Sequence, residues 1–441
     1  MPANLEEVER AIEQPGDRRV AATVAVSILG WSLDLFDLFA ILYLAPTIAP
    51  LFFPSNSPTL SLAGVFGAFA VTLLMRPAGS TLFGAYADRH GRRRPMAVAV
   101  VSVGIVTGLM GAVPTIEQIG VAAPVIFLLL RLVQGILVGG VAATTGTIAM
   151  EVVAARWRGL LSGVIAVAAA ALAGLLASGI FYFVSSVFAG PRFAVWGWRV
   201  MFFSGVLTSV LGVFIFRSLE ESPLWSRMRR QATRVEKAPV RALLSSRYRR
   251  TVAANLAVAI GGATQFYLTS GYLPTFLAVV NHLPKPAIGW ILTLTSLSLM
   301  LTGSLAGHVS ELVGRRKFFL AVNLVNAVLF PLLYVALSGL RANRAGAITA
   351  LVVAIATLGN ASIAAVLVFL NESFPTAVRA TGVGVCWNVG FAIGGMTTTF
   401  ATAASVDVEG ITRSVLLFLE GAVIIYLLGA LAMRETRGRL E

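Results

Sequence analysis

The sequence has little charge and almost no cysteine. Of its 441 residues 12% are charged, whereas soluble globular proteins average about a quarter. The single cysteine, Cys386, excludes an internal disulfide and a cysteine metal cluster. His90, His282 and His308 lack metal-ligand spacing, so we expect neither a metal nor a cofactor. A phosphate-binding loop, a nucleophile elbow and an ATPase module are also missing from the sequence, which argues against an enzyme and against ATP-driven chemistry.

Apolar sequence is abundant instead. Hydrophobic residues make up 57% of the chain, and the mean hydropathy is +0.85. They gather in stretches of roughly 20 residues, long enough to cross a hydrocarbon core of about 30 Å as helices. We predict an all-α polytopic membrane protein with twelve spans, near residues 20–45, 61–87, 95–113, 121–149, 160–188, 197–217, 251–279, 287–309, 318–338, 345–371, 380–404 and 412–433.

The basic residues predict the orientation of these spans. With the N-terminus inside, the inner segments carry 26 of the 34 Lys and Arg residues and the outer segments carry 6. Because basic loops stay on the cytoplasmic side, we predict cytoplasmic termini in the cell (inner) membrane. The net charge of +14 is spread over these loops, so we expect no nucleic-acid partner. The apolar run from Val20 lacks a convincing cleavage site, and we expect no cleaved signal peptide.

The longest polar loop divides the spans into six and six. We predict a tail at residues 1–19, a helical bundle at 20–217, a central loop at 218–250, a second bundle at 251–433 and a tail at 434–441. Pro46 is expected to end the first span, and Pro274 falls at the matching place in the seventh.

A loop motif occurs once in each half, at residues 84–93 and again 223 residues later at 307–316. Each copy reads Gly, three residues, an acid, two residues and Gly-Arg-Arg. A second pattern, an acid seven residues before an arginine, joins Glu151 to Arg158 and Glu372 to Arg379. Duplicated loops between membrane spans indicate a duplicated bundle, which is the plan of a secondary transporter.

We interpret these loops as a latch on the cytoplasmic face. A carboxylate held among guanidinium groups and helix ends forms a strong contact that can still break. The alternative is that the arginines only orient the loops. The predicted latch comprises Gly84, Asp88, Arg89, Gly91, Arg92, Arg93, Glu151 and Arg158 in the first half, and Glu311, Gly314, Arg315, Arg316, Glu372 and Arg379 in the second.

At these residues the chain resembles the major facilitator superfamily over nearly its whole length. The resemblance implies two pseudo-symmetric six-helix bundles, the major facilitator fold, around a cavity that opens alternately inward and outward. It also implies that spans 1, 4, 7 and 10 line this cavity. No metal or organic cofactor is implied, because a proton gradient drives many members of the superfamily.

Charged residues inside the spans are candidates for function. An idle charge at a helix centre costs about 2.5–3.5 kcal/mol on insertion scales. Asp34 and Asp37 share one face of span 1, and their mutual repulsion favours proton binding by one of them. Arg131 opens Arg-Leu-Val-Gln-Gly, which resembles a span-4 motif tied to proton coupling in the superfamily. We predict Asp37 as the main proton site with Asp34 in support, while Arg131 binds a substrate carboxylate or neutralises an acid.

Two further charges leave alternatives open. Arg76 in Met75-Arg76-Pro77 resembles a segment of the metabolite:proton symporters, and it either binds an anion or pairs with an acid of span 1. Glu420 lies in span 12, where a structural hydrogen bond is the favoured interpretation over a transport role.

Polar residues of spans 7, 10 and 11 complete the predicted substrate site. Their alternative role is hydrogen bonding between helices. By the match of Pro46 to Pro274, the neutral Gln265 is placed opposite Asp37. The predicted substrate-binding residues are Arg131, Arg76, Gln134, Gln265, Tyr267, Asn360, Trp387 and Asn388.

Two more segments resemble one branch of the superfamily. Glu221-Ser222-Pro223 and Glu435-Thr436-Arg437-Gly438 look like marks of the sugar and metabolite:proton symporters. The nearest likeness is to bacterial metabolite:proton and sialate/lactate-type symporters, which implies uptake of a small organic anion with protons by a monomer in the bilayer. The alternatives are a sugar or polyol:proton symporter, a proton-driven drug exporter and a membrane sensor. Exporters carry Gly-Pro in span 5, which this chain lacks, and the short tails offer no signalling domain.

Overall fold

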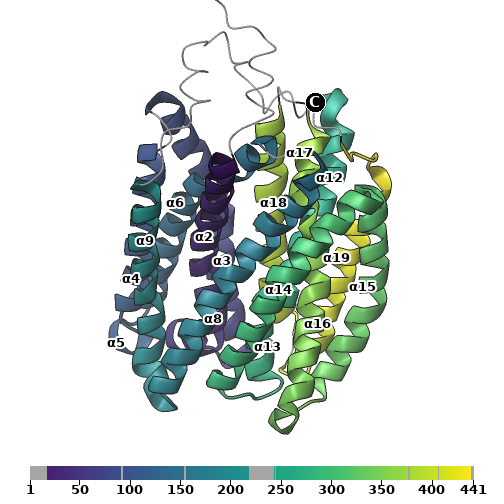
Figure 1. Cartoon of the computed structure of the whole chain (residues 1–441). Helices are drawn as coiled ribbons and strands as arrows, with labels where there is room; N and C mark the ends of the chain where they lie inside the picture. The colour runs from purple at the N-terminus through teal and green to yellow at the C-terminus, as the bar shows by residue number, and fades with distance from the viewer. Residues whose placement is uncertain are drawn as a thin grey trace, which may run out of the picture.

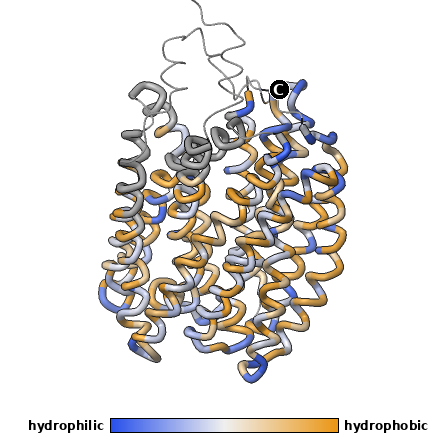
Figure 2. Tube along the Cα trace, in the orientation of Figure 1, coloured by the Kyte–Doolittle hydropathy of each residue, from blue (hydrophilic) through white to orange (hydrophobic). Residues whose placement is uncertain are grey.

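The computed structural model describes residues 17–90, 93–152, 155–217, 243, 245–375, 378–405 and 407–438. Within these residues the regular structure is helical and there is no strand. Hydrophobic residues colour most of the length of the helices, and hydrophilic residues gather toward the two ends of the bundle (Figure 2). This is the distribution that a membrane imposes on a bundle standing across it.

The first half contains six helical rods joined by short turns. Two of them include a π-helical turn, η2 in the fifth rod and η3 in the sixth. The short elements α5 (Ile116–Ile119) and η1 (Ala155–Trp157) lie between rods. In chain order the rods are α2 (Asp17–Phe52), α3 (Pro58–His90), α4 (Arg93–Ala112), α6 (Ala122–Val152), α7–η2–α8 (Arg158–Gly163, Val164–Ala168, Ala169–Val187) and η3–α9 (Phe193–Gly197, Trp198–Arg217).

The second half repeats this plan. Its first rod again contains a π-helical turn, and its fourth rod breaks near Ala365. The short η5 (Ala342–Arg344) precedes that fourth rod. The rods are α12–η4–α13 (Ser246–Phe266, Tyr267–Gly271, Leu273–Val279), α14 (Lys285–Val313), α15 (Arg315–Ser338), α16–α17 (Ala345–Ala364, Val366–Ser373), α18 (Arg379–Ala403) and α19 (Ile411–Ala432).

These rods confirm the predicted spans. In the described residues nine helical stretches are long and apolar enough to cross a membrane, and α4 and η3–α9 supply two shorter apolar helices. Together with α18 they account for all twelve. The protein therefore has the predicted all-α fold of 12 transmembrane helices in two pseudo-symmetric halves.

The prediction that Pro46 ends the first span is wrong. Helix α2 continues past Pro46 and Pro50 to Phe52. A proline interrupts the hydrogen bonds of a helix, but neighbouring helices and local adjustments satisfy the freed groups in membrane bundles. Pro274 behaves differently, because it lies in the first turn of α13 after the π-helical turn η4.

The two halves meet along two helix pairs. Helix α8 of the first half packs on α14 of the second, and α3 packs on α18. Figure 1 shows α8 and α14 running side by side between the two groups of helices. In the same view the start of α2 and the C-terminus lie at one end of the bundle, as expected for an even number of spans.

At that end the two halves touch through glycines. A Cβ atom on Gly307 of α14 would collide with the carbonyl oxygen of Gly159 in α7, and one on Gly163 would collide with that of Gly303. The hydroxyl of Ser162 donates to the carbonyl of Ala364 at 2.7 Å and accepts from the backbone N–H of Val368 at 3.2 Å. Small residues let two helix backbones approach this closely.

The opposite end is also closed. The Thr59 hydroxyl donates to the carbonyl of Ser405 at 3.0 Å, and the rings of Phe66 and Tyr272 stack with centroids 5.1 Å apart. A cavity between the halves, bordered by Phe39 and Asn360, has a volume of about 20 Å³, which is space for about one water. With both ends joined, the structure is a closed conformation.

We predict that a larger side chain at the glycine contact opens this end. In Gly307→Val the added atoms meet the Gly159 carbonyl and force α7 away from α14. Spin labels at Arg156→Cys and Leu312→Cys, both exposed, report the separation in a Cys386→Ala background. Pulsed electron paramagnetic resonance should show longer distances in Gly307→Val. Gly179→Val is the control because a Cβ there meets nothing within 4 Å, and equal distance distributions in all three proteins would contradict the prediction.

Candidate functional site

Several predicted residues are only partly covered by the structure. Gly91 and Arg92 lie outside the described residues. The side chains of Arg89 and Arg93, and those of the acids Asp34, Asp88 and Glu151, also lie outside what the structure describes, as do the surroundings of Gly84. The site is therefore built from the remaining predicted residues.

A charged cluster lies inside the first half, where α2, α3 and α6 meet. Asp37, Arg76, Arg131 and Gln134 line one cavity of about 10 Å³. All are buried, with relative exposures of 3% for Asp37, 7% for Arg76 and 1% for Arg131. The structure thus brings together the predicted acid of span 1 and the predicted arginines of spans 2 and 4.

Arg131 is positioned by a chain of hydrogen bonds. Its Nη1 donates to Gln134 Oε1 at 2.6 Å, and Gln134 Nε2 donates to the hydroxyl of Thr107 in α4 at 2.7 Å. The guanidinium also lies 5.6 Å from the ring centroid of Phe127 and 6.0 Å from that of Phe202. Its Nε and Nη2 have no hydrogen-bond partner among the described residues, so two donors remain for an anion.

Asp37 is the nearby charge that balances Arg131. The two interact electrostatically, and both border the same cavity. Gly205 of α9 lies against the carboxylate, since a Cβ there would stand 3.0 Å from Asp37 Oδ1. A buried charge is stable only when it is paired and hydrogen-bonded. Arg76 lines this cavity as well, which places it beside the acid of span 1 and within reach of any anion there.

Thr107 and Gly205 were not predicted from the sequence. Thr107 lies on α4 and Gly205 lies on α9. The resemblance does not place either helix at the cavity. A hydroxyl and a glycine inside apolar spans are too common to identify a site. Their importance follows only from the packing of α4 and α9 against α2 and α6.

The second half holds a neutral cluster at the corresponding place. Gln265 of α12 donates through Nε2 to Asn323 Oδ1 at 2.8 Å, and its Oε1 accepts from Asn326 Nδ2 at 2.8 Å. Both asparagines lie on α15, and all three side chains are buried. Gln265 therefore bonds to a neighbouring helix inside its own half, and Asn323 and Asn326 are members that the sequence did not single out.

The remaining predicted substrate residues lie at or near the interface of the halves. The ring of Tyr267 packs 5.4 Å from Phe69, and that of Trp387 lies 5.6 Å from Trp31. The contacts of the other two residues differ. Asn360 borders the 20 Å³ cavity and donates to the hydroxyl of Ser270 at 2.8 Å. Asn388 donates at 2.9 Å to the carbonyl of Gly384 in its own helix.

The second copy of the loop motif forms a buried ion cluster. Arg315 is fully buried, and its Nη2 lies 2.5 Å from Glu311 Oε2 and 3.1 Å from Glu372 Oε1. Its Nε donates to the other oxygen of Glu372 at 3.1 Å. Glu311 also accepts from the backbone N–H of Gly159 at 3.0 Å, which links the cluster to the first half. This bond joins the two halves at this end, while the role of these residues as a latch stays a prediction.

The other latch residues of this end have separate contacts. Arg379 is buried and donates through Nε to the carbonyl of Phe374 at 3.2 Å. Arg316 donates through Nη2 to the carbonyl of Leu431 in α19 at 3.0 Å. Arg158 begins α7 and is partly buried, and Gly314 adopts φ of 99°, a conformation that favours glycine.

The segment after α19 joins this cluster. Glu435 accepts from the backbone N–H of Arg315 at 2.9 Å and of Arg316 at 3.1 Å, so its carboxylate caps the start of α15. Partial burial acts to raise the pKa of Glu435, but hydrogen bonds from the N–H groups of Arg437, Arg315, Arg316 and Thr436 lower that pKa below its usual value. Thr436 donates to Glu372 Oε2 at 3.0 Å. The sequence marked these residues only by resemblance and not as part of the latch.

Comparison with known proteins agrees with this architecture. Residues 53–241 match the family model of the sugar (and other) transporters. The chain is 24% identical over 434 residues to the proline/betaine transporter of Escherichia coli (strain K12), covering 96% of this chain and 85% of that protein. It is 30% identical over 381 residues to the citrate-proton symporter of Salmonella typhi, covering 84% of each. The crystal structure of a D-xylose-proton symporter matches with a TM-score of 0.71 at 18% identity, over 96% of this chain and 99% of that one, which shows a shared fold.

We predict that Arg315→Leu destabilises the protein strongly. The substitution leaves Glu311 and Glu372 buried without their cation, and breaking a buried ion pair in this way costs about 3–5 kcal/mol. Thermal unfolding of the purified protein in detergent should show a lower midpoint. Lys317→Leu removes an exposed charge two residues away and serves as the control. An unchanged midpoint in Arg315→Leu would contradict the stabilising role of the cluster.

Proposed function

The chain belongs to the major facilitator superfamily, and on this premise we propose that it imports a small organic acid together with protons. It is a membrane transporter and not an enzyme. In the proposal a proton gradient drives uptake across the cell (inner) membrane, with both termini in the cytoplasm and a monomer as the working unit. Net uptake proceeds by alternating access between inward-open and outward-open states.

The observation that carries the proposal is the charged cluster of the first half. Arg131 is buried with two nitrogen atoms, Nε and Nη2, that lack hydrogen-bond partners among the described residues, beside a carboxylate that can take up a proton. A guanidinium offers paired donors that match a carboxylate. This arrangement supports recognition of an anion, whereas a neutral sugar has no charge to balance the buried cation.

The formal charges explain why a proton would accompany the substrate. Arg76 and Arg131 balance Asp34 and Asp37 on helices α2, α3 and α6, so the four residues sum to zero. A substrate carboxylate adds one negative charge in a region where unbalanced charge is costly. Protonation of Asp37 restores neutrality and removes its electrostatic attraction for Arg131. Substrate and proton therefore stabilise each other's binding.

The relatives are consistent with a carboxylate substrate. Citrate, proline and betaine, named for two of them, all carry a carboxylate. Asn360 and Ser270, at the edge of the small cavity between the halves, offer hydrogen bonds to the uncharged part of such a molecule. Because that cavity holds about 20 Å³, a substrate requires the halves to part before it can bind.

Two rival functions make different demands on the cluster. A sugar or polyol symporter does not require the guanidinium of Arg131 for its substrate, so neutral-substrate uptake that survives Arg131→Gln and Arg76→Gln would favour it. A proton-driven exporter is disfavoured because α8 and the segment before it carry no proline. Screening radiolabelled lactate, sialate, aromatic acids and dicarboxylates in vesicles with an imposed proton gradient separates these possibilities.

We predict that Asp37→Asn abolishes proton-driven accumulation and preserves part of the substrate exchange. The amide keeps the shape of the side chain but cannot carry a proton between the two sides. Vesicles measure both activities, accumulation with an imposed proton gradient and counterflow without one. Asp407→Asn, in an exposed turn before α19, is the matched control. Full accumulation by Asp37→Asn would refute the assignment of Asp37 as the proton site.

A further inference from the structure

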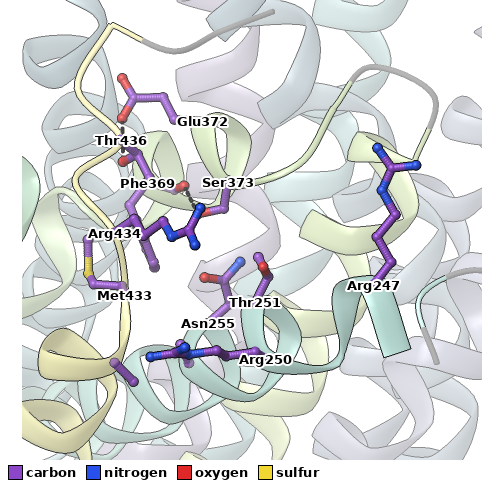
Figure 3. A pocket seen from close by; sticks show the side chains of 12 residues that line it. Arg247, Arg250, Thr251, Asn255, Phe369, Glu372, Ser373, Met433, Arg434 and Thr436 are labelled. Atoms are coloured by element: carbon purple, nitrogen blue, oxygen red, sulfur yellow. Dashed lines mark hydrogen bonds between the residues drawn. The ribbon is translucent and has the colours of Figure 1, made fainter. Parts of the chain in front are cut away.

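A cavity of about 350 Å³ lies in the second half, apart from the charged cluster of Asp37 and Arg131. It is bordered by the start of α12, the end of α17 and the chain that follows α19 (Figure 3). These elements lie at the end of the bundle that holds the C-terminus. The volume falls in the range of small-ligand sites, which run from about 300 to 1,000 Å³.

One face of α12 supplies most of the polar lining. Arg247, Arg250, Thr251 and Asn255 follow one another at helical spacing and all border the cavity. Asn255 is 1% exposed, and its Nδ2 has no hydrogen-bond partner among the described residues. A buried amide N–H without a partner is costly, so this position favours a ligand that accepts a hydrogen bond.

The opposite wall adds a third guanidinium. Arg434 follows α19, and in Figure 3 its guanidinium points toward Ser373 and Asn255. Arg250 lies along the floor of the cavity in this view, and Arg247 stands apart at the rim. Cationic groups from two separate elements thus face a common space.

The positive charge of this cavity is not neutralised within the described structure. The acid in its lining, Glu372, is already bonded to Arg315 and Thr436. Arg247, Arg250 and Arg434 form no salt bridge with the described residues. The guanidinium groups of Arg250 and Arg434 beside a buried amide donor form a recognition pattern for a multivalent oxyanion, with Arg247 adding positive charge at the rim.

We propose that this cavity binds a phosphate-bearing anion at the cytoplasmic face. A phosphate group has enough charge and enough acceptor oxygens to engage Arg250, Arg434 and the Asn255 amide together. The volume exceeds that of the phosphate group alone and accommodates an ester substituent. Such a group is found both in lipid headgroups and in soluble metabolites, and the same donors recognise either.

An anion in this cavity would connect α12 to the segment after α19, which contacts the ion cluster of Arg315. Arg434 directly precedes Glu435, whose carboxylate caps α15, and Thr436, which donates to Glu372. An anion held between Arg250 and Arg434 would therefore fix this segment against the start of α12. The expected result is greater stability of the whole protein when the anion is bound.

Two arms of one experiment distinguish the sources of the phosphate. The full-length protein in detergent is titrated with inorganic phosphate, at ionic strength held constant with sodium chloride, while thermal unfolding is followed. In parallel, binding to vesicles of phosphatidylcholine is compared with binding to vesicles that also contain phosphatidylglycerol. A response to phosphate identifies a soluble ligand, and a response to phosphatidylglycerol alone identifies a lipid headgroup.

The variants Arg250→Gln, Arg434→Gln and Asn255→Ala test the site itself. Each guanidinium removed should weaken the response about tenfold, because charge-assisted hydrogen bonds are lost. Arg249→Gln removes an exposed charge from the next position on α12, which does not border the cavity, and should respond like the unmodified protein. Failure of both arms, or equal losses in Arg249→Gln and Arg250→Gln, would overturn the proposal.

Discussion

The buried guanidinium of Arg131 constrains how the helices of the first half pack together. A cation at 1% exposure inside an apolar bundle is stable only if its neighbours compensate its charge and its donors. Asp37 supplies the charge, Gln134 and Thr107 hold one end of the guanidinium, and the rings of Phe127 and Phe202 lie beside it. These contacts come from four helices and explain why the first half packs tightly around its polar centre.

The two halves share an architecture but not an electrostatic character. Each half has a buried polar centre to which its first and third rods contribute, Asp37 and Thr107 in one half and Gln265 and Asn326 in the other. The second centre is a neutral amide network that holds α12 on α15. At the end where the termini lie, the second half holds the buried ion cluster of Arg315, Glu311 and Glu372. The proposed proton site and this ion cluster therefore lie in different halves of the molecule.

The sequence predicts the fold well because apolar length and loop charge are local properties. All twelve spans follow from it, while Pro46 misleads because neighbouring helices determine whether a proline ends a span. The site is only partly predictable for a related reason. Asp37 and Arg131 stand out as charges in apolar runs, whereas Thr107, Gly205 and Asn323 are ordinary residues until packing brings them together. Gln265 was predicted as a substrate-binding residue with helix–helix hydrogen bonding as the alternative, and in the structure its amide bonds to α15.

The central claim is that Asp37 takes up the proton that accompanies the substrate. Infrared difference spectroscopy of the reconstituted protein tests it directly, because the carboxyl group absorbs differently when it is protonated. If Asp37 takes up the proton, a protonated-carboxyl band should appear when substrate is added. The band should be absent from Asp37→Asn and present in Asp407→Asn. A band of unchanged intensity in Asp37→Asn would contradict the role of Asp37 as the proton site and assign the proton to another group.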